Sequence, residues 1–197
     1  AIAKGGLAMA EDKVARLMKE TDRQMVEGVE ATRREFGMVR TGRANPAILD
    51  RVLVEYYGEM VPIKQVGTIS APEPRLLLIS AWDKSMIKAI VDAITSSDLG
   101  LNPNTDGNLI RMPLPRLTTE RRQELARMVA RKAEEGKVGV RNIRRDTIER
   151  LRAMQKAGEI SEDDFHRYQE QAQKITDAHI EQLDKLQQSK EREIMEG

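Results

Sequence analysis

The sequence predicts an α+β protein: a long three-helix bundle with a small mixed α/β domain, sandwich-like in its β/α/β layering, inserted after the first helix. Two observations predict this fold. Near both ends of the chain, apolar residues recur every three or four positions, as on one face of an amphipathic helix. Between these stretches lie the prolines and several short runs of β-branched residues separated by turn residues. We expect the bundle in residues 1–42 and 117–197 and the inserted domain in residues 43–116.

The composition agrees with a folded, largely helical protein. Of the 197 residues, 40% are hydrophobic and 33% are charged, so the chain can bury a core beneath a charged surface. Aromatic residues make up only 3%, which leaves Leu, Ile, Val, Met and Ala to fill that core. The lack of cysteine excludes disulfides and thiolate metal sites and fits a reducing compartment. We expect a cytoplasmic monomer without a membrane segment.

The first helix is predicted from Val14 to Val39, because Val14, Met18, Met25 and Phe36 fall on one helical face. It should end near Gly42, because glycine commonly stops helices and the residue before Pro46 disfavours helix. Residues 1–12 are expected to be an expression-tag remnant or a disordered extension.

The inserted domain is predicted to contain four strands and one short helix. The strands are expected at residues 51–57, 66–70, 76–79 and 108–112, with turns at residues 102–104 and 106–107. The 66–70 strand should stop before Ala71-Pro72. Asp83 is a suitable N-cap for a helix in which Ile87, Ile90, Val91 and Ile94 share a face.

The second long helix is predicted to begin after Thr118, an N-cap residue, and to end at the Ala157-Gly158 turn. Ser161 and Asp164 then form a capping box for the third. Each of the three helices has one apolar stripe that it cannot bury alone, so they should pack together.

The chain crosses between bundle and insertion twice, and we expect these crossings to form a two-stranded hinge. Two crossings restrict twisting more than one, but relative domain motion remains the default expectation for such an arrangement. The predicted hinge residues are Arg40, Thr41, Gly42, Arg43, Pro113, Leu114, Pro115, Arg116 and Leu117.

No constellation typical of an enzyme is found in the sequence. His166 and His179 are too far apart on one predicted helix to act as a metal-binding pair, and His179 falls on the apolar face. Nucleotide-binding and zinc-protease motifs do not occur. We therefore expect no catalytic site, no metal and no cofactor.

A basic stripe on the second long helix is the candidate binding site. Residues 118–159 contain 12 basic and 7 acidic side chains, whereas residues 160–197 contain 5 and 10. At 100° per residue, five cations fall on one face beside the apolar stripe. They are Lys137, Arg141, Arg144, Arg145 and Arg152. Arginine favours bidentate contacts with phosphate, so this face suits the backbone of structured RNA rather than base readout.

Two other interpretations stay open at this point. Opposite charges on neighbouring helices can simply neutralise one another across a hairpin. The bundle can also act as a helical adaptor that binds a protein partner, in which case the basic face serves solubility.

Six motifs, in the same order along the chain, resemble the ribosome recycling factor family. The resemblance runs from about Lys13 to the C-terminus. The motifs are Arg-Thr-Gly-Arg-Ala-Asn-Pro at 40–46, Val-Glu-Tyr-Tyr-Gly at 54–58, Asp-Leu-Gly-Leu-Asn-Pro-Asn at 98–104, Pro-Leu-Pro-Arg-Leu-Thr-Thr-Glu-Arg-Arg at 113–122, Val-Arg-Asn-Ile-Arg-Arg-Asp at 140–146 and Ile-Ser-Glu-Asp-Asp at 160–164.

The resemblance implies an L-shaped protein that acts on the post-termination ribosome. It implies binding to large-subunit ribosomal RNA at the subunit interface, and splitting of the subunits together with elongation factor G and GTP. It places the family's functionally critical arginine at Arg144 and the hinge at the two crossings. Arg116 departs from the family pattern, since many members have a proline there. DNA and membranes are not implied as partners, and the factor itself hydrolyses nothing.

Overall fold

The computed structural model describes residues 4–196, and the chain divides into two compact units. The helical unit comprises the chain up to Val39 together with Gln123–Arg192. The inserted unit comprises Arg40–Arg122, with the last residues from Glu193. The predicted fold class, three long helices and a small α/β domain, is confirmed.

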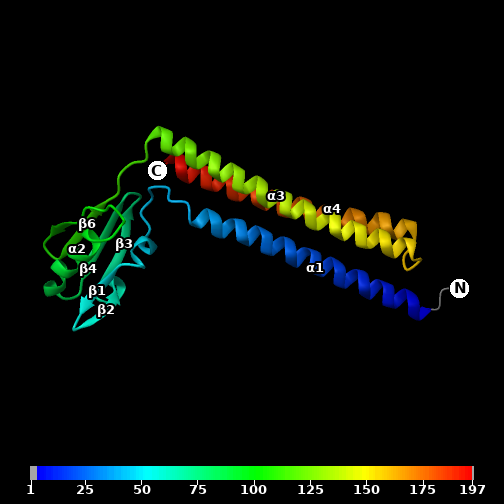
Figure 1. Ribbon diagram of the computed structural model, residues 1–197, viewed down its shortest axis with the longest axis horizontal. Coiled ribbons are helices and arrows are strands. Elements are labelled where there is room, and N and C mark those ends of the chain that lie inside the picture. Colours follow the sequence, from blue (N-terminus) through cyan, green and yellow to red (C-terminus); the bar gives the residue numbers. More distant parts are fainter. Residues whose placement is uncertain (1–3, 197) are drawn as a thin grey trace. The chain divides into compact units, whose positions relative to one another are not determined.

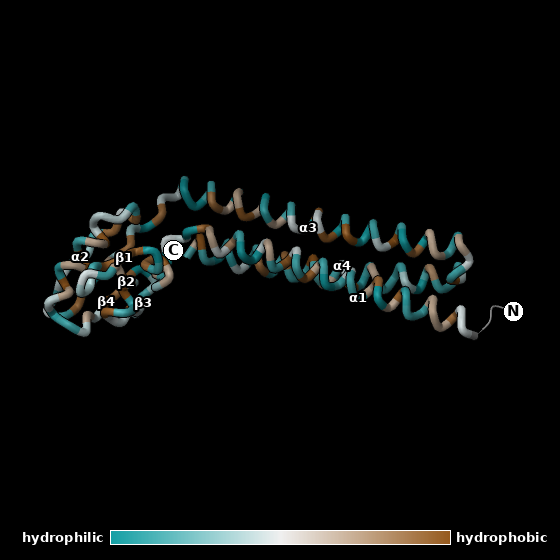
Figure 2. Tube along the Cα trace, turned by 60° about the horizontal axis from the view of Figure 1, so that its bottom comes forward, coloured by the Kyte–Doolittle hydropathy of each residue, from teal (hydrophilic) through white to brown (hydrophobic). Residues whose placement is uncertain are grey.

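Three helices run side by side in the helical unit: α1 (Lys4–Gly37), α3 (Thr119–Lys156) and α4 (Glu162–Glu196) (Figures 1 and 2). Apolar and polar residues alternate along each of them (Figure 2). One buried cluster joins Ala10 and Val14 of α1 to Leu151 and Met154 of α3 and Phe165 of α4. A second cluster is formed by Met25, Val29, Val140 and Leu183, again from all three helices. The bundle therefore buries the stripes that the periodicity identified.

Helix α1 begins earlier than predicted. Residues 4–12 are helical, so the expectation of a disordered extension is wrong for them, whereas the expectation of a tag remnant stays a prediction. Residues 1–3 lie outside the described part of the chain. Ala10, Val14 and Leu17 continue the same apolar stripe toward the N-terminus. Ala10 is buried against α3 and α4, and this packing accounts for the additional turns.

The ends of α3 and α4 follow the predicted capping. Thr118 Oγ1 accepts a hydrogen bond from the Arg121 amide at 3.1 Å, and Ser161 Oγ accepts one from the Asp164 amide at 3.0 Å. At the end of α3, Gly158 has φ +73°, and the Glu159 amide donates to the Met154 carbonyl at 2.9 Å. This left-handed cap turns the chain back so that α4 can pack against α3.

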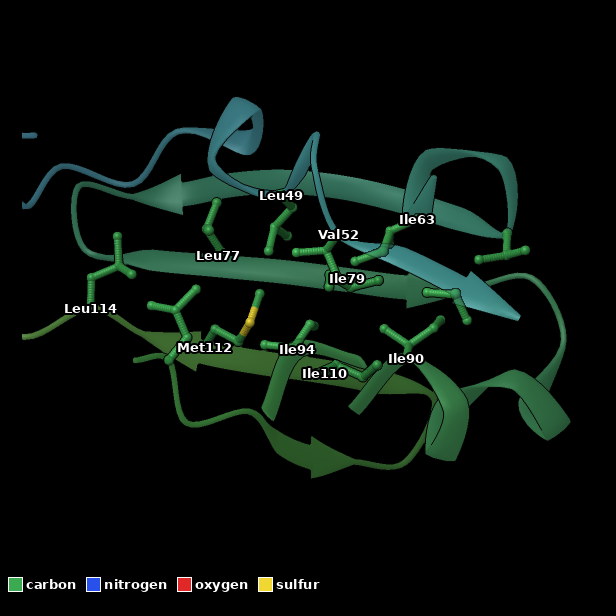
Figure 3. Packing of buried hydrophobic residues seen from close by; sticks show 13 residues of the cluster. Leu49, Val52, Ile63, Leu77, Ile79, Ile90, Ile94, Ile110, Met112 and Leu114 are labelled. Atoms are coloured by element: carbon green, nitrogen blue, oxygen red, sulfur yellow. The ribbon is translucent and has the colours of Figure 1, made fainter. Parts of the chain in front are cut away.

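The inserted unit contains two antiparallel sheets, one complete α-helix, α2 (Ile87–Thr95), and three short 3-10 helices, Pro46–Leu49, Ile63–Gln65 and Lys84–Met86. The two-stranded sheet pairs β1 (Leu53–Tyr56) with β2 (Glu59–Pro62). The four-stranded sheet has the order β3 (Gly67–Glu73), β4 (Leu76–Ala81), β6 (Leu109–Pro113) and β5 (Asn104–Asp106). Buried residues from the four-stranded sheet, from α2 and from the segments that flank the two-stranded sheet form the core; they include Ile79, Ile110, Ile90, Val52 and Ile63 (Figure 3).

Two strands were not predicted, and β3 and β4 end later than predicted. Strand β2 is paired through a two-residue turn in which Tyr57 and Gly58 both have positive φ, as type I′ hairpins require. Strand β5 consists of turn-forming residues and is held by pairing with β6. Strand β3 continues through Pro72, because a register shift between Ser70 and Glu73 accommodates the missing amide.

The two crossing segments are both hydrogen-bonded to the turn between β3 and β4. The Ala44 amide donates to the Pro74 carbonyl at 2.7 Å, and the Leu114 amide donates to the neighbouring Arg75 carbonyl at 2.8 Å. Gly42 has φ +75°, and a Cβ atom there would lie 3.3 Å from the Leu117 side chain. Both crossings are therefore fastened to the β3–β4 turn and pass close to one another.

Candidate nucleic-acid interface on α3

Helix α3 carries all five cations of the predicted stripe, and the structure divides them into two groups. Arg144, Arg145 and Arg152 line a surface groove of about 390 Å³, which Ile148, Glu149, Gln169 and Gln173 complete from α3 and α4. We call this the α3–α4 groove. Lys137 and Arg141 lie nearer the N-terminal end of α3 and are paired with carboxylates.

Arg144 is the most constrained member of the α3–α4 groove. Its Nη1 donates to Gln173 Oε1 of α4 at 3.0 Å, and its Nε is buried with no partner among the described residues. Gln173 Nε2 in turn donates to Asp177 Oδ1 at 2.8 Å. One side of the guanidinium is thus held against α4, on the wall of the groove.

The other two arginines of the groove are less restrained. Arg145 is exposed. The Arg152 guanidinium carbon lies 5.2 Å from the centre of the Phe165 ring, a cation–π distance that orients the side chain without neutralising it. Three guanidinium groups and two amides against a single carboxylate, Glu149, give the groove a positive charge suited to phosphate oxygens.

Lys137 and Arg141 are engaged by acidic side chains. The Lys137 ammonium forms an ion pair with Asp184 of α4, and only 16% of its side chain is exposed. Arg141 Nη1 lies 3.2 Å from Glu134 Oε1 on the same helix. The helical wheel placed these cations beside the apolar stripe but could not show which carboxylates lie opposite them.

His179 lies inside the bundle, where its Nε2 is 2.8 Å from Asp22 Oδ1 of α1. His179, which the sequence places on the apolar face of its helix, thus joins α4 to α1. Exposed His166 lies 3.9 Å from Glu162. Within residues 4–196, no group of His, Asp and Glu is arranged to hold a metal ion. None of the helices described here is long and apolar enough to span a bilayer.

Sequence reasoning missed the α4 side of the groove, Gln169 and Gln173, and also Asp177, which accepts a hydrogen bond from Gln173. The i, i+4 spacing of Gln173 and Asp177 on a predicted helix was available as a signal. Their position opposite Arg144 depends on the register of α3 against α4, which a single-helix wheel does not contain.

The fold is that of a three-helix protein in which a small α/β unit is inserted after the first helix. The family model described as "Ribosome recycling factor" matches residues 32–195. The chain is 51% identical over 179 residues to the ribosome-recycling factor of Rubrobacter xylanophilus, covering 91% of this chain and 96% of that protein. It is also 51% identical over 180 residues to that of Halalkalibacterium halodurans, covering 91% and 97%. The chain belongs to the ribosome recycling factor family.

Solved structures agree with this membership. A ribosome recycling factor determined in solution matches with a TM-score of 0.68 and 43% identity, over 94% of this chain and 98% of that one. The second is the T. thermophilus ribosome recycling factor, in a structure that also holds E. coli elongation factor G, bound to the E. coli post-termination complex. It matches with a TM-score of 0.60 and 44% identity, over 92% and 98%. The role of the family lies in ribosome recycling, a step of protein biosynthesis.

Proposed function

We propose that this chain releases ribosomes from mRNA after termination by splitting the post-termination complex into subunits, together with elongation factor G and GTP. In this proposal it binds large-subunit ribosomal RNA at the subunit interface as a cytoplasmic monomer and performs no hydrolysis itself. Family membership and the relative placed with elongation factor G on the post-termination complex support the partners.

The α3–α4 groove carries the RNA-binding part of the proposal. Arg144, Arg145 and Arg152 stand together on a rigid helix, and arginine is the side chain best suited to bidentate phosphate contacts. No base-stacking row of aromatic residues accompanies them among the groove residues, so the contact is with the RNA backbone and shape.

The hinge provides the mechanical part. The bundle stays anchored on RNA while elongation factor G pushes the inserted unit, which swings about residues 40–43 and 115–117. Pro113 pairs within β6 and Leu114 belongs to the core of the inserted unit, so these two predicted hinge residues move with that unit. The positive φ of Gly42 and the proline at 115 give the two hinge segments non-helical backbones. The work of separating RNA-rich contacts comes from the GTP cycle of the translocase, since binding energy alone would leave the factor bound.

Disassembly of purified post-termination ribosomes by elongation factor G and GTP tests the proposal. Wild type is compared with Arg144→Ala and with Arg150→Ala, which removes an exposed arginine of the same helix outside the groove. We expect wild type and Arg150→Ala to split ribosomes, and Arg144→Ala to lose most of its activity while keeping the same circular dichroism. A wild type that is inactive with a compatible translocase would refute the proposed function.

A salt titration separates RNA backbone binding from the helical-adaptor alternative. For a phosphate contact, the logarithm of the affinity for large subunits falls steeply with the logarithm of the salt concentration, by roughly 0.7 to 0.9 for each phosphate contacted. The affinity for a protein partner that binds an apolar helix face would depend only weakly on the salt concentration. We expect the steep dependence, and a reduced slope for Arg144→Ala.

A further inference from the structure

The hydrogen bonds of Gln173 define its amide orientation without ambiguity. A guanidinium can only donate, so the side facing Arg144 must be the amide carbonyl. A carboxylate can only accept, so the side facing Asp177 must be the amide nitrogen. Arg144, Gln173 and Asp177 therefore form a directed chain of hydrogen bonds, in which Arg144 of α3 donates to Gln173 of α4 and Gln173 donates to Asp177.

This chain restricts the conformation of Arg144. Arginine loses considerable rotamer freedom when it is immobilised on a ligand, and that loss subtracts from affinity. The bond from Nη1 to Gln173 and the burial of Nε hold the guanidinium before any ligand arrives. Part of the conformational entropy that Arg144 would lose on binding is therefore already lost when the chain folds.

We infer that Gln173, oriented by Asp177, is a positioning residue that presents Arg144 to an RNA phosphate; this inference rests on the function proposed above. Gln173 acts through Arg144 and does not need to touch the RNA. The neutrality of the amide is part of its role. A glutamate in its place would hold Arg144 as firmly but would cancel the positive charge that attracts the phosphate.

A matched control exists on the same helix. Gln187 Nε2 donates to Glu191 Oε1 at 2.9 Å, the same i, i+4 amide–carboxylate pair, and Gln187 is half-buried like Gln173. Gln187 is not among the residues that line the groove. Replacing either glutamine by methionine removes the hydrogen bonds while keeping length and helix propensity.

The experiment measures the affinity of the full chain for isolated large ribosomal subunits at fixed salt, and the ordering of the Arg144 side chain by ¹⁵Nε NMR relaxation. The variants are Gln173→Met, Gln173→Glu, Gln187→Met, Arg144→Ala and the double variant Arg144→Ala/Gln173→Met. Thermal unfolding checks that each is folded. If the unfolding midpoint of Gln173→Met differs from that of wild type, Gln173→Ala is used in its place.

We expect Gln173→Met to weaken binding about fivefold and to mobilise Arg144, while Gln187→Met changes neither. Gln173→Glu should keep Arg144 ordered and still weaken binding. In the Arg144→Ala background, Gln173→Met should have no further effect. If Arg144→Ala weakens binding but Gln173→Met does not, the positioning role is refuted and the proposed function stands. If Arg144→Ala binds like wild type, the RNA-binding part of the proposed function is itself wrong.

Discussion

The arginines of α3 differ in whether a carboxylate neutralises their charge, because their neighbours differ. Arg144 is held by a neutral amide and keeps its charge available, whereas Arg141 is paired with Glu134. Periodicity predicted the positions of both, since it depends only on spacing along one helix. Periodicity could not predict that Gln173 of α4 lies opposite Arg144, because the register of one helix against another is set by packing across the bundle.

Glu20 offers a pH-dependent prediction at the residue scale. Arg23 Nη2 lies 2.6 Å from Glu20 Oε1 and Arg23 Nε lies 2.9 Å from Oε2, a bidentate pair on exposed α1. These hydrogen bonds, with a smaller contribution from Gln24, lower the pKa of Glu20 from 4.5 to about 2. We expect Arg23→Gln to return that pKa toward 4.5, as measured by carboxyl ¹³C NMR titration.

The sign of the stability effect follows from the lowered pKa. The pair favours ionised Glu20 in the folded chain, so its contribution is fully present above pH 4.5 and is lost as the pH falls toward 2. High salt should shrink the difference between wild type and Arg23→Gln, because the pair is exposed. An unchanged Glu20 pKa in the variant would show that Arg23 is not its cause.

At the scale of elements, two glycines of α3 give opposite predictions. A Cβ at Gly136 would lie 2.6 Å from Thr32 Oγ1 of α1 and 3.4 Å from Leu183 of α4, whereas one at Gly139 would meet nothing within 4 Å. Alanine improves helix propensity by about 1 kcal/mol at either site. Overpacking costs about 1 to 3 kcal/mol at Gly136 alone.

We therefore expect Gly139→Ala to raise the free energy of unfolding by up to about 1 kcal/mol. Gly136→Ala should lower it by up to about 2 kcal/mol, because the overpacking among three helices offsets or exceeds the gain in helix propensity. Urea denaturation of both variants checks this. Equal stabilisation by the two substitutions would mean that the contact among α1, α3 and α4 at Gly136 is looser than described.

The elements that the sequence predicted are those whose own residues define them. The long helices have apolar stripes, α3 and α4 also have capping residues, and β4 begins with a run of aliphatic residues. Strands β2 and β5 have neither, and they exist because β1 and β6 offer free edges for pairing. The first turns of α1 were missed for the same reason, since the partners of Ala10 lie on α3 and α4.

At the scale of the whole molecule, the inserted unit contains its complete core. Every buried residue of the cluster drawn in Figure 3 lies between Leu49 and Leu114. We expect a fragment of residues 44–114 to fold alone, with a cooperative thermal transition and dispersed amide NMR signals. Ile79→Ala in this fragment, which truncates a fully buried side chain, should cost about 2 to 5 kcal/mol and abolish the transition. An unfolded wild-type fragment would contradict the prediction.

The shared attachment of Ala44 and Leu114 to the β3–β4 turn has a consequence for folding order. In the unfolded chain, pairing α1 with α3 requires closing a long loop, and the entropic cost rises with the logarithm of loop length. Once the insertion has folded, its two ends are fixed on the adjacent carbonyls of Pro74 and Arg75, so that loop behaves as a short one. The saving is on the order of 2 kcal/mol. Early folding of the insertion would accordingly accelerate assembly of the bundle.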